Sequence, residues 1–286
     1  MRIGIGLPNP VPDTPGVRMV EWARRAEDRG FTALTTIDRI VFPSYDSLTA
    51  LAVAAGATTR IGLTTNILLA PVYPPVLLAK TAASLDQLSG GRLTLGLAVG
   101  GRPDDFAAVG RDPGTRGRDF DAALDLMHRA WRGEPVVGGE EAVCPTPVNE
   151  ARVPILVGGT SDAAVRRVVE WGAGWTAGGG SAEQMAPMVE RIRTAWRDAG
   201  RAGEPRLAAL AYFALGAEEE SRAYLRRYYG FTGPYAEQIA AGALRTEAAV
   251  ADAVRAFADA GFTELYFDPT TAGVEQVDRL ADVVSP

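Results

Sequence analysis

The chain has 286 residues, 47% of them hydrophobic, which is ordinary globular composition and enough to bury a large core. Its formal net charge at pH 7 is -6 and its basic residues are dispersed, so we expect no nucleic-acid partner. The single cysteine, Cys144, excludes an internal disulfide. Pro8 comes too early for a signal peptide, and no apolar run approaches the roughly 18 residues of a membrane span. We therefore expect a cytoplasmic protein without a membrane partner.

Short β-rich runs alternate with longer stretches of helical periodicity along the whole chain. Strands are predicted over residues 2–7, 33–37, 61–69, 93–99, 153–157, 174–177, 206–215 and 264–267. Helices are predicted over residues 17–29, 47–58, 75–88, 118–131, 162–171, 183–199 and 274–283. Three further helical segments lie between the seventh and eighth strands, broken by YYGFTGPY at 228–235. The segment 133–152 is rich in proline and glycine and reads as an excursion that could hold a small hairpin.

Eight strands alternating with helices predict a (β/α)8 TIM barrel, formed as a single domain over residues 1–286. The excursion follows the fourth βα unit, and the extra helices lie between strands seven and eight. A doubly wound open sheet is the alternative architecture. It is disfavoured because the first strand is followed by GIGLPN, which has only the first two glycines of a dinucleotide-binding GxGxxG motif.

In a barrel of this kind, functional residues gather where the strands end. Five successive predicted strands end in polar or glycine-rich stretches. These are Asp38-Arg39, TTNILLAP (64–71), VGGRPDDF (99–106), VGGTSD (157–162) and TAGGGSAEQ (176–184). The carboxyl end of the barrel is therefore the predicted functional face.

Two of these loops have the composition of a phosphate-binding site. Gly158 and Gly159 precede Thr160 and Ser161 at a predicted helix start, and Gly178, Gly179 and Gly180 precede Ser181 in the same way. A helix N-terminus with free N–H groups and no obstructing side chain favours a phosphate. Glycine and serine are also ordinary turn and cap residues, so each loop alone could be purely structural.

The remaining polar candidates each have a structural alternative. Asp38 and Arg39 could form a plain ion pair, and Asp104 and Asp105 could cap a short helix. His128 lies within a predicted helix and reads as a packing residue. One histidine and one cysteine do not support a zinc site or a Ser-His-Asp triad, and nothing marks a carboxylate metal site, so we expect no metal.

An aromatic cluster between the seventh and eighth strands could be either core or a substrate lid. Its members are Tyr224, Tyr228, Tyr229, Phe231 and Tyr235.

Several segments resemble the bacterial-luciferase-like flavin oxidoreductases, the luciferase-like monooxygenase family. They lie at 46–110, 116–136 (RGRDFDAALDLMHRAWRGEPV) and 153–175 (VPILVGGTSDAAVRRVVEWGAGW), and together cover most of residues 1–180. The run LLAKTAASLDQLSGGRLTLGLAVGG at 77–101 is highly specific, whereas the last hundred residues match loosely.

The resemblance implies a TIM barrel that binds reduced FMN or the deazaflavin coenzyme F-420 at its carboxyl end. It implies a bulge with a non-prolyl cis peptide at Asn66-Ile67, behind the flavin ring. It places Asp38, Gly100, Gly101 and Asp105 at the polar edge of the ring. The cofactor phosphate would be held by the two glycine loops, Gly158 to Ser161 and Gly178 to Gly180.

The function implied is that of a flavin-dependent monooxygenase, which receives reduced FMN from a separate flavin reductase and uses oxygen on a small organic substrate. The alternatives are hydride transfer with coenzyme F-420 and a non-catalytic flavin-binding protein. The predicted helices 47–58 and 75–88 are rich in alanine and leucine beyond one face, so we also expect a homodimer, as the resemblance suggests.

Two residues depart from the family pattern. Arg39 stands where many members have histidine, and Arg102 stands where the sugar-phosphate and alcohol dehydrogenases have glutamate. Their acid–base pair is therefore missing from this chain, and we take Asp38 and Arg39 as the candidate catalytic residues. Arg39 could hold a positive charge near the anionic edge of the ring, but its pKa is too high for proton shuttling.

Overall fold

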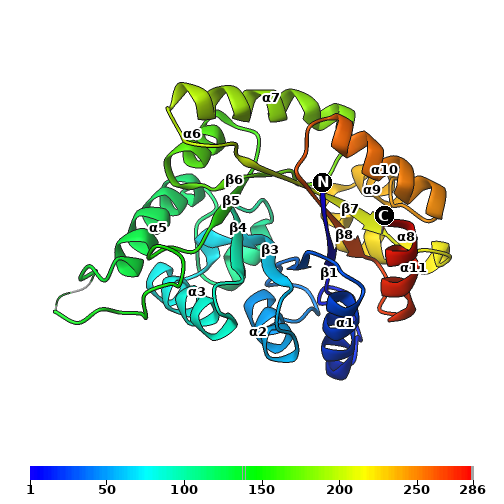
Figure 1. The fold of residues 1–286 in the computed structure, drawn as a ribbon, viewed down its shortest axis with the longest axis horizontal. Coiled ribbons are helices and arrows are strands. Elements are labelled where there is room, and N and C mark those ends of the chain that lie inside the picture. The colour runs from blue at the N-terminus through cyan, green and yellow to red at the C-terminus, as the bar shows by residue number, and fades with distance from the viewer. Residues whose placement is uncertain (137, 139, 285–286) are drawn as a thin grey trace.

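The computed structural model of the protein describes residues 1–136, 138 and 140–284, and its centre is a closed barrel of eight parallel strands (Figure 1). Each strand pairs with the next one in the chain, and β8 pairs with β1 to close the sheet. The strands are β1 (Arg2–Gly6), β2 (Ala33–Thr36), β3 (Gly62–Leu69), β4 (Leu93–Ala98), β5 (Ile155–Gly158), β6 (Gly174–Thr176), β7 (Arg206–Phe213) and β8 (Glu264–Pro269). The predicted (β/α)8 barrel is thus confirmed.

Helices surround the barrel, as Figure 1 shows. They are α1 (Gly16–Asp28), α2 (Ser47–Ala57), α3 (Pro75–Ser89), α4 (Pro103–Ala108), α5 (Arg116–Trp131), α6 (Asp162–Trp171), α7 (Ala182–Asp198), α8 (Glu218–Tyr228), α9 (Tyr235–Ala241), α10 (Glu247–Asp259) and α11 (Glu275–Val284), with short 3₁₀ helices η1 (Ala70–Val72) and η2 (Gly230–Thr232). In α1, for example, Met19, Trp22, Ala23 and Ala26 are buried at three- and four-residue spacing, which fixes the helix face turned to the core. No helix within the described residues has the length and apolarity needed to cross a bilayer.

The structure departs from the predicted elements in two places. The 3₁₀ helices η1 and η2 were not predicted, because a single turn is too short to show helical periodicity. The short helix considered at Asp104 and Asp105 is present as α4, with both acids inside its first turn and Arg102 at the N-cap position. In the excursion, residues 133–136, 138 and 140–152 form turns and bends without a strand, so the small hairpin is not seen in the described part; residues 137 and 139 lie outside it.

An ion pair fills the layer of the barrel interior at the amino ends of the strands. Arg206 of β7 donates two hydrogen bonds to Glu264 of β8, at 2.6 and 2.9 Å, and a third to the hydroxyl of Thr94 at 3.1 Å. Burial alone would raise the pKa of Glu264, but the hydrogen bonds and charge of Arg206 outweigh it and keep the pKa below its usual value. This layer closes the amino end of the barrel.

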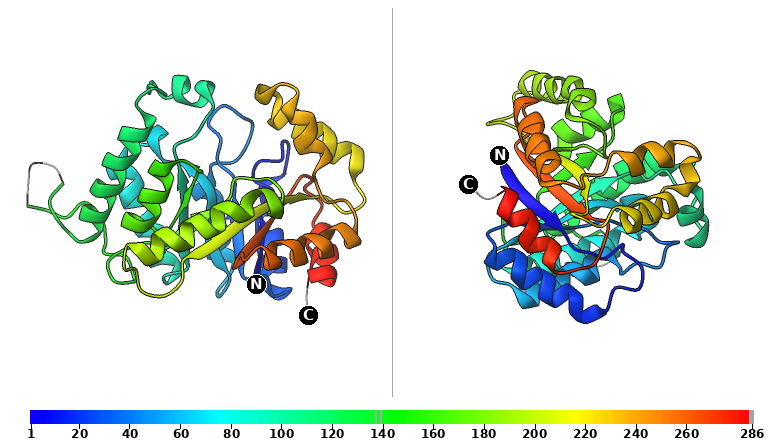
Figure 2. Two further views of the ribbon diagram at one scale, coloured as in Figure 1. Left: turned by 90° about the horizontal axis from the view of Figure 1, so that it is seen from above. Right: turned by 90° about the vertical axis from the view of Figure 1, so that its right-hand side faces the viewer.

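The opposite, carboxyl end carries the extra helices. In the left view of Figure 2 the two chain termini lie at one end of the barrel, and α9 with the adjoining part of α8 lies at the other, above the strand ends. The predicted break at 228–235 separates α8 from α9 as expected. The segment α8–η2–α9, residues 218–241, therefore forms a cover on the face where the functional residues are predicted.

Candidate active site

Asp38 lies two residues after the end of β2 and ties this strand to β3. Its carboxylate accepts hydrogen bonds from the backbone N–H of Leu69 (3.0 Å), the hydroxyl of Tyr73 (2.9 Å) and the hydroxyl of Ser47 (3.4 Å). Burial raises the pKa of Asp38 to about 6, although the hydrogen bonds from Leu69 and Tyr73 oppose this rise. Both oxygens are thus engaged in fixing the polypeptide around the end of β3.

The segment held by Asp38 is the predicted bulge. The pairing register between β3 and β4 shifts between Thr65 and Leu68, and the Asn66-Ile67 peptide bond is cis, so both predictions are confirmed. Asn66 accepts a hydrogen bond at 2.7 Å from the hydroxyl of Thr176 on β6, across the barrel. Its side-chain nitrogen is buried and, within the part of the chain that the structure describes, has no partner. The bulge therefore leaves one buried hydrogen-bond donor free.

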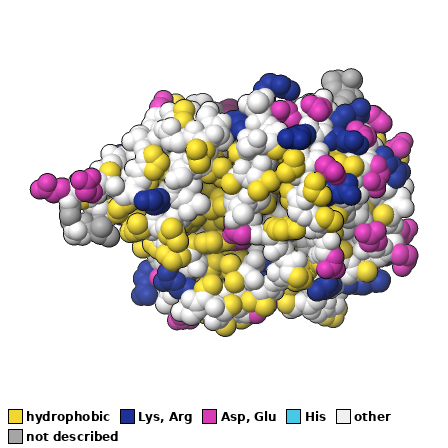
Figure 3. All heavy atoms as spheres, turned by 90° about the horizontal axis from the view of Figure 1, so that it is seen from below, with side chains coloured by type: hydrophobic (Ala, Val, Ile, Leu, Met, Phe, Trp, Pro, Cys, Tyr) yellow, Lys and Arg dark blue, Asp and Glu magenta, His cyan; other side chains and the backbone are white. Residues whose placement is uncertain are grey.

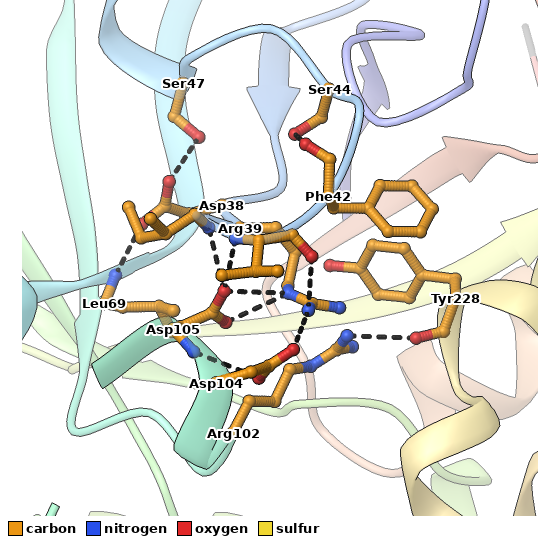
Figure 4. A network of polar contacts seen from close by, with 12 residues as sticks. Asp38, Arg39, Phe42, Ser44, Ser47, Leu69, Arg102, Asp104, Asp105 and Tyr228 are labelled. Carbon is orange, nitrogen blue, oxygen red and sulfur yellow. Dashed lines mark hydrogen bonds and ion pairs between the residues drawn. The ribbon is translucent and has the colours of Figure 1, made fainter. Parts of the chain in front are cut away.

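Arg39 turns away from Asp38 and pairs with the two acids of α4, as Figure 4 shows. Its guanidinium lies 3.0 Å from Asp104 and 2.9 Å from Asp105. Asp105 is fully buried and also accepts the backbone N–H groups of Ile40 (3.0 Å) and Val41 (2.7 Å). Both acids thus bind Arg39, and Asp105 also holds the loop after β2 in place.

Arg102 joins the end of β4 to the cover. It is buried, donates a hydrogen bond at 2.9 Å to the backbone carbonyl of Tyr228, and places its guanidinium 4.4 Å from the ring centre of Tyr228 and 4.1 Å from that of Phe231. Such cation–π contacts are stabilising when they are shielded from water. Sequence reasoning identified Arg102 only as a departure from the family and missed this role.

The aromatic cluster serves partly as core and partly as surface. Tyr224 and Tyr228 are buried, and the hydroxyl of Tyr229 lies 2.6 Å from that of Tyr212 on β7. Phe231 and Tyr235 are each 54% exposed. The core alternative thus holds for the inner tyrosines, which pack on the strand ends. The outer rings are exposed, and their role as a substrate lid stays a prediction.

The two glycine loops lie side by side, because they follow the paired strands β5 and β6. Ser161 and Ser181 cap α6 and α7 by accepting the N–H groups of Ala164 and Gln184, each at 3.2 Å. A Cβ atom at Gly178 or Gly179 would meet nothing within 4 Å, and Gly159, Gly179 and Gly180 have positive φ values of 107°, 88° and 119°. The loops therefore expose backbone at two helix N-termini, as a phosphate cradle requires.

The other predicted glycines have different surroundings. A Cβ at Gly100 would press on Phe106 (3.3 Å) and Leu69 (3.4 Å), and one at Gly158 would press on Ile67 (3.1 Å), so both glycines make room for neighbouring side chains. A Cβ at Gly101 would meet nothing within 4 Å. Of these three, Gly101 alone offers open backbone.

His128 and Asp268 are two further buried or half-buried polar groups. His128 donates a hydrogen bond from Nδ1 to the carbonyl of Leu124 at 2.8 Å and packs on Trp131 and Trp171, so the predicted packing role is confirmed. Asp268, at the end of β8, was not predicted as a site residue. Its carboxyl group is buried among the strand ends and accepts a hydrogen bond from the hydroxyl of Thr35 at 2.8 Å.

The burial of Asp268 predicts a specific pH dependence of stability. Burial raises its pKa from 3.8 to about 7, although the hydrogen bond from Thr35 opposes the rise. The folded state therefore binds a proton more tightly than the unfolded chain, and the stability due to this group is lost as the pH rises from about 4 to about 7. Relative to Asp268→Asn, the wild type should lose up to about 1.4 kcal/mol of unfolding free energy per pH unit in that window.

Urea unfolding of both proteins between pH 4 and pH 8 measures this difference. The pKa of Asp38 is also raised, to about 6, but Asp38 is present in both proteins, so its contribution to the pH dependence cancels in the difference. A difference in stability that stays constant across the window would contradict the assignment.

The comparisons with known proteins agree with this geometry. The model of the luciferase-like monooxygenase family matches residues 1–266. An uncharacterised protein of Mycobacterium tuberculosis (strain ATCC 25618 / H37Rv) is 30% identical over 206 residues, which cover 63% of this chain and 71% of the relative.

Solved structures of similar fold include enzymes with two different cofactors. One is an F420-dependent secondary alcohol dehydrogenase in complex with an F420-acetone adduct, with a TM-score of 0.81, 18% identity and coverage of 99% of this chain and 98% of that one. Another is the oxygenating constituent of the 3,6-diketocamphane monooxygenase of Pseudomonas putida in complex with FMN, with a TM-score of 0.76, 16% identity and coverage of 100% and 98%. With the family model matching nearly the whole chain, the protein belongs to the luciferase-like monooxygenase family.

Proposed function

We propose that this protein is a flavin-dependent monooxygenase that binds reduced FMN at the carboxyl end of its barrel and uses oxygen on a small organic substrate. The observation that carries the proposal is the open pair of glycine loops after β5 and β6, on the same barrel end as the Asn66-Ile67 bulge. Membership of the luciferase-like monooxygenase family supports it. The reduced FMN would come from a separate reductase.

The residues present fit such a cofactor. Backbone N–H groups of Gly159 to Ser161 and Gly178 to Gly180, at the N-termini of α6 and α7, would hold the phosphate. Arg191 of α7 lies beside the first loop, donating to the carbonyl of Thr160 at 3.1 Å and pairing with Asp162, and would help to hold this loop in place. The ring would lie against the bulge and Gly101, where the free side-chain nitrogen of Asn66 is a donor for a ring oxygen or nitrogen.

These contacts assign a role to each group at the site. Bound reduced FMN would supply the electrons with which oxygen is activated. Asp38 would keep the bulge in shape, and Asp105 would position Arg39, whose charge lies at the rim. The cover, held by Arg102, would exclude water from the reaction.

Two other functions remain as alternatives. Hydride transfer with coenzyme F-420 is supported by the similarity to the F420-dependent alcohol dehydrogenase. A non-catalytic flavin-binding protein is supported by the engagement of Arg39 and Arg102 in protein contacts at positions where relatives have catalytic residues.

Anaerobic titration with reduced FMN and with reduced coenzyme F-420 tests the proposal. We expect wild type to bind reduced FMN, and Gly179→Leu to weaken binding at least tenfold, since the new side chain fills the phosphate cradle. Gly203→Leu is the matched control, because Gly203 also has a positive φ and open space but lies in the turn before β7, at the amino end of the barrel.

The outcomes separate the three functions. Binding of F-420 alone selects hydride transfer. Binding of FMN, with no oxygenated product when air and candidate substrates are then added, selects the carrier function. If both leucine variants lose the same affinity for reduced FMN, the phosphate is not bound at the glycine loops. If wild type binds neither cofactor, the proposal is overturned.

We also propose that the protein acts as a homodimer formed through α2 and α3, and that it is cytoplasmic, as its free thiol Cys144 suggests. Figure 3, which views the molecule from the side of these helices, shows hydrophobic side chains gathered in the middle of the face and charges around it. Val53, Leu77 and Leu88 are 42%, 58% and 85% exposed there. Exposed apolar surface of this kind is typical of a subunit interface.

Leu77→Arg combined with Leu88→Arg should convert the dimer to monomer, because two charges would be buried without partners. Val17→Arg on α1, which also replaces an exposed apolar residue, should leave the dimer intact. Light scattering at micromolar concentration measures the mass. A monomeric wild type, or a dimer in the double variant, would exclude this interface.

A further inference from the structure

Asp268 has one carboxylate oxygen that the protein does not use. It is the last inward-facing residue of β8 and is 1% exposed. On the neighbouring strand β1, a Cβ atom at Gly6 would collide with it, so only glycine lets the carboxylate reach across β1 to Thr35 on β2. This contact occupies Oδ1, whereas Oδ2 is buried with no hydrogen-bond partner among residues 1–136, 138 and 140–284.

No ion pair among the described residues compensates this carboxylate. Arg39 and Arg102, the cations at the rim, are engaged by Asp104, Asp105 and the carbonyl of Tyr228. A buried carboxylate oxygen without a partner is costly, and such groups in native proteins often mark a ligand site. The pKa of about 7, caused by burial, means that the group is about half ionised near neutral pH.

Three tyrosines, Tyr212, Tyr224 and Tyr229, lie close to Asp268. Tyr212 lies directly opposite it in the register of β7 and β8, and its hydroxyl is paired with that of Tyr229 in the cover. The hydroxyl of Tyr224 is also buried and, in the described structure, unpartnered. Together with Leu210 and Ile37, these rings form one apolar cluster between the strand ends and the cover.

We propose that Asp268 is a substrate-binding residue, whose Oδ2 accepts a hydrogen bond from the hydroxyl or amino group of an aromatic substrate. The substrate ring would pack among Tyr212, Tyr224 and Tyr229, which offer flat apolar faces. A substrate with a carboxylate at this position is disfavoured by repulsion, so the chemical class is a neutral phenol or aromatic amine. This assignment rests on the proposed function for the reaction, but the binding itself does not require the cofactor.

Access to Asp268 requires movement of the cover. Tyr224 and Tyr228 are on the buried face of α8, and Arg102 holds Tyr228 and Phe231 at the rim. The substrate therefore reaches the carboxylate when these side chains move aside, and the cover closes over it afterwards.

A matched pair of probes tests the hydrogen bond. 1-Naphthol carries a donor hydroxyl, and 1-methoxynaphthalene has the same ring system without a donor; both are followed by fluorescence at pH 8. We expect wild type to bind 1-naphthol at least tenfold more tightly than 1-methoxynaphthalene. Asp268→Asn, which presents an amide of the same shape, should reduce this preference to threefold or less and leave the affinity for 1-methoxynaphthalene unchanged. Glu219→Gln, an exposed acid on α8, is the control variant and should retain the preference.

Each other outcome counts against the proposal. Equal binding of the two probes by wild type, no saturable binding of either, or a preserved preference in Asp268→Asn would overturn it. Should Asp268→Asn fail to fold, a co-crystal of wild type with 1-naphthol decides: the hydroxyl must lie within hydrogen-bonding distance of Oδ2, and naphthol bound elsewhere would overturn the assignment. Failure of the proposed function would give a different result: wild type would not bind reduced FMN but would still bind 1-naphthol more tightly than 1-methoxynaphthalene.

Discussion

The hydrogen bonds that Asp105 accepts from the N–H groups of Ile40 and Val41 hold the rim of the barrel together. Through them α4 fixes the loop after β2, and the same carboxylate places Arg39 beside the rings of Phe42 and Tyr228. Tyr228 in turn is bound by Arg102, so the cover, α4 and the β2 loop form one connected unit. A fully buried carboxylate is costly unless it is hydrogen-bonded, which explains why so many contacts converge on Asp105.

The carboxyl end of the barrel divides into two halves of different chemistry. From β3 to β6 the strand ends offer exposed backbone, glycines and the free amide of Asn66, which suit the ring and phosphate of a flavin. At β7 and β8 they offer tyrosines and Asp268, which suit an aromatic molecule with one polar group. We infer that cofactor and substrate occupy these two halves, with Asn66 and Asp268 as the polar groups that each half leaves free.

The sequence predicts the barrel well because strand and helix periodicities alternate strongly along it. The bulge at Asn66-Ile67 followed from the family resemblance, and no local pattern would have indicated it. Contacts over long distances in the chain were beyond prediction: Arg102 meets Tyr228, 126 residues away, and Thr35 meets Asp268, 233 residues away. Asp268 was missed for a simpler reason, since aspartate followed by proline is unusual in a strand and the predicted eighth strand ended at Phe267.

A crystal structure of the protein with reduced FMN, grown without oxygen, tests the central claim most directly. The account predicts the phosphate between the loops of Gly159 and Gly179 and the ring against the Asn66-Ile67 bulge, with the space next to Asp268 left for substrate. FMN with its phosphate at any other place, or a ring stacked on the tyrosines beside Asp268, would contradict it.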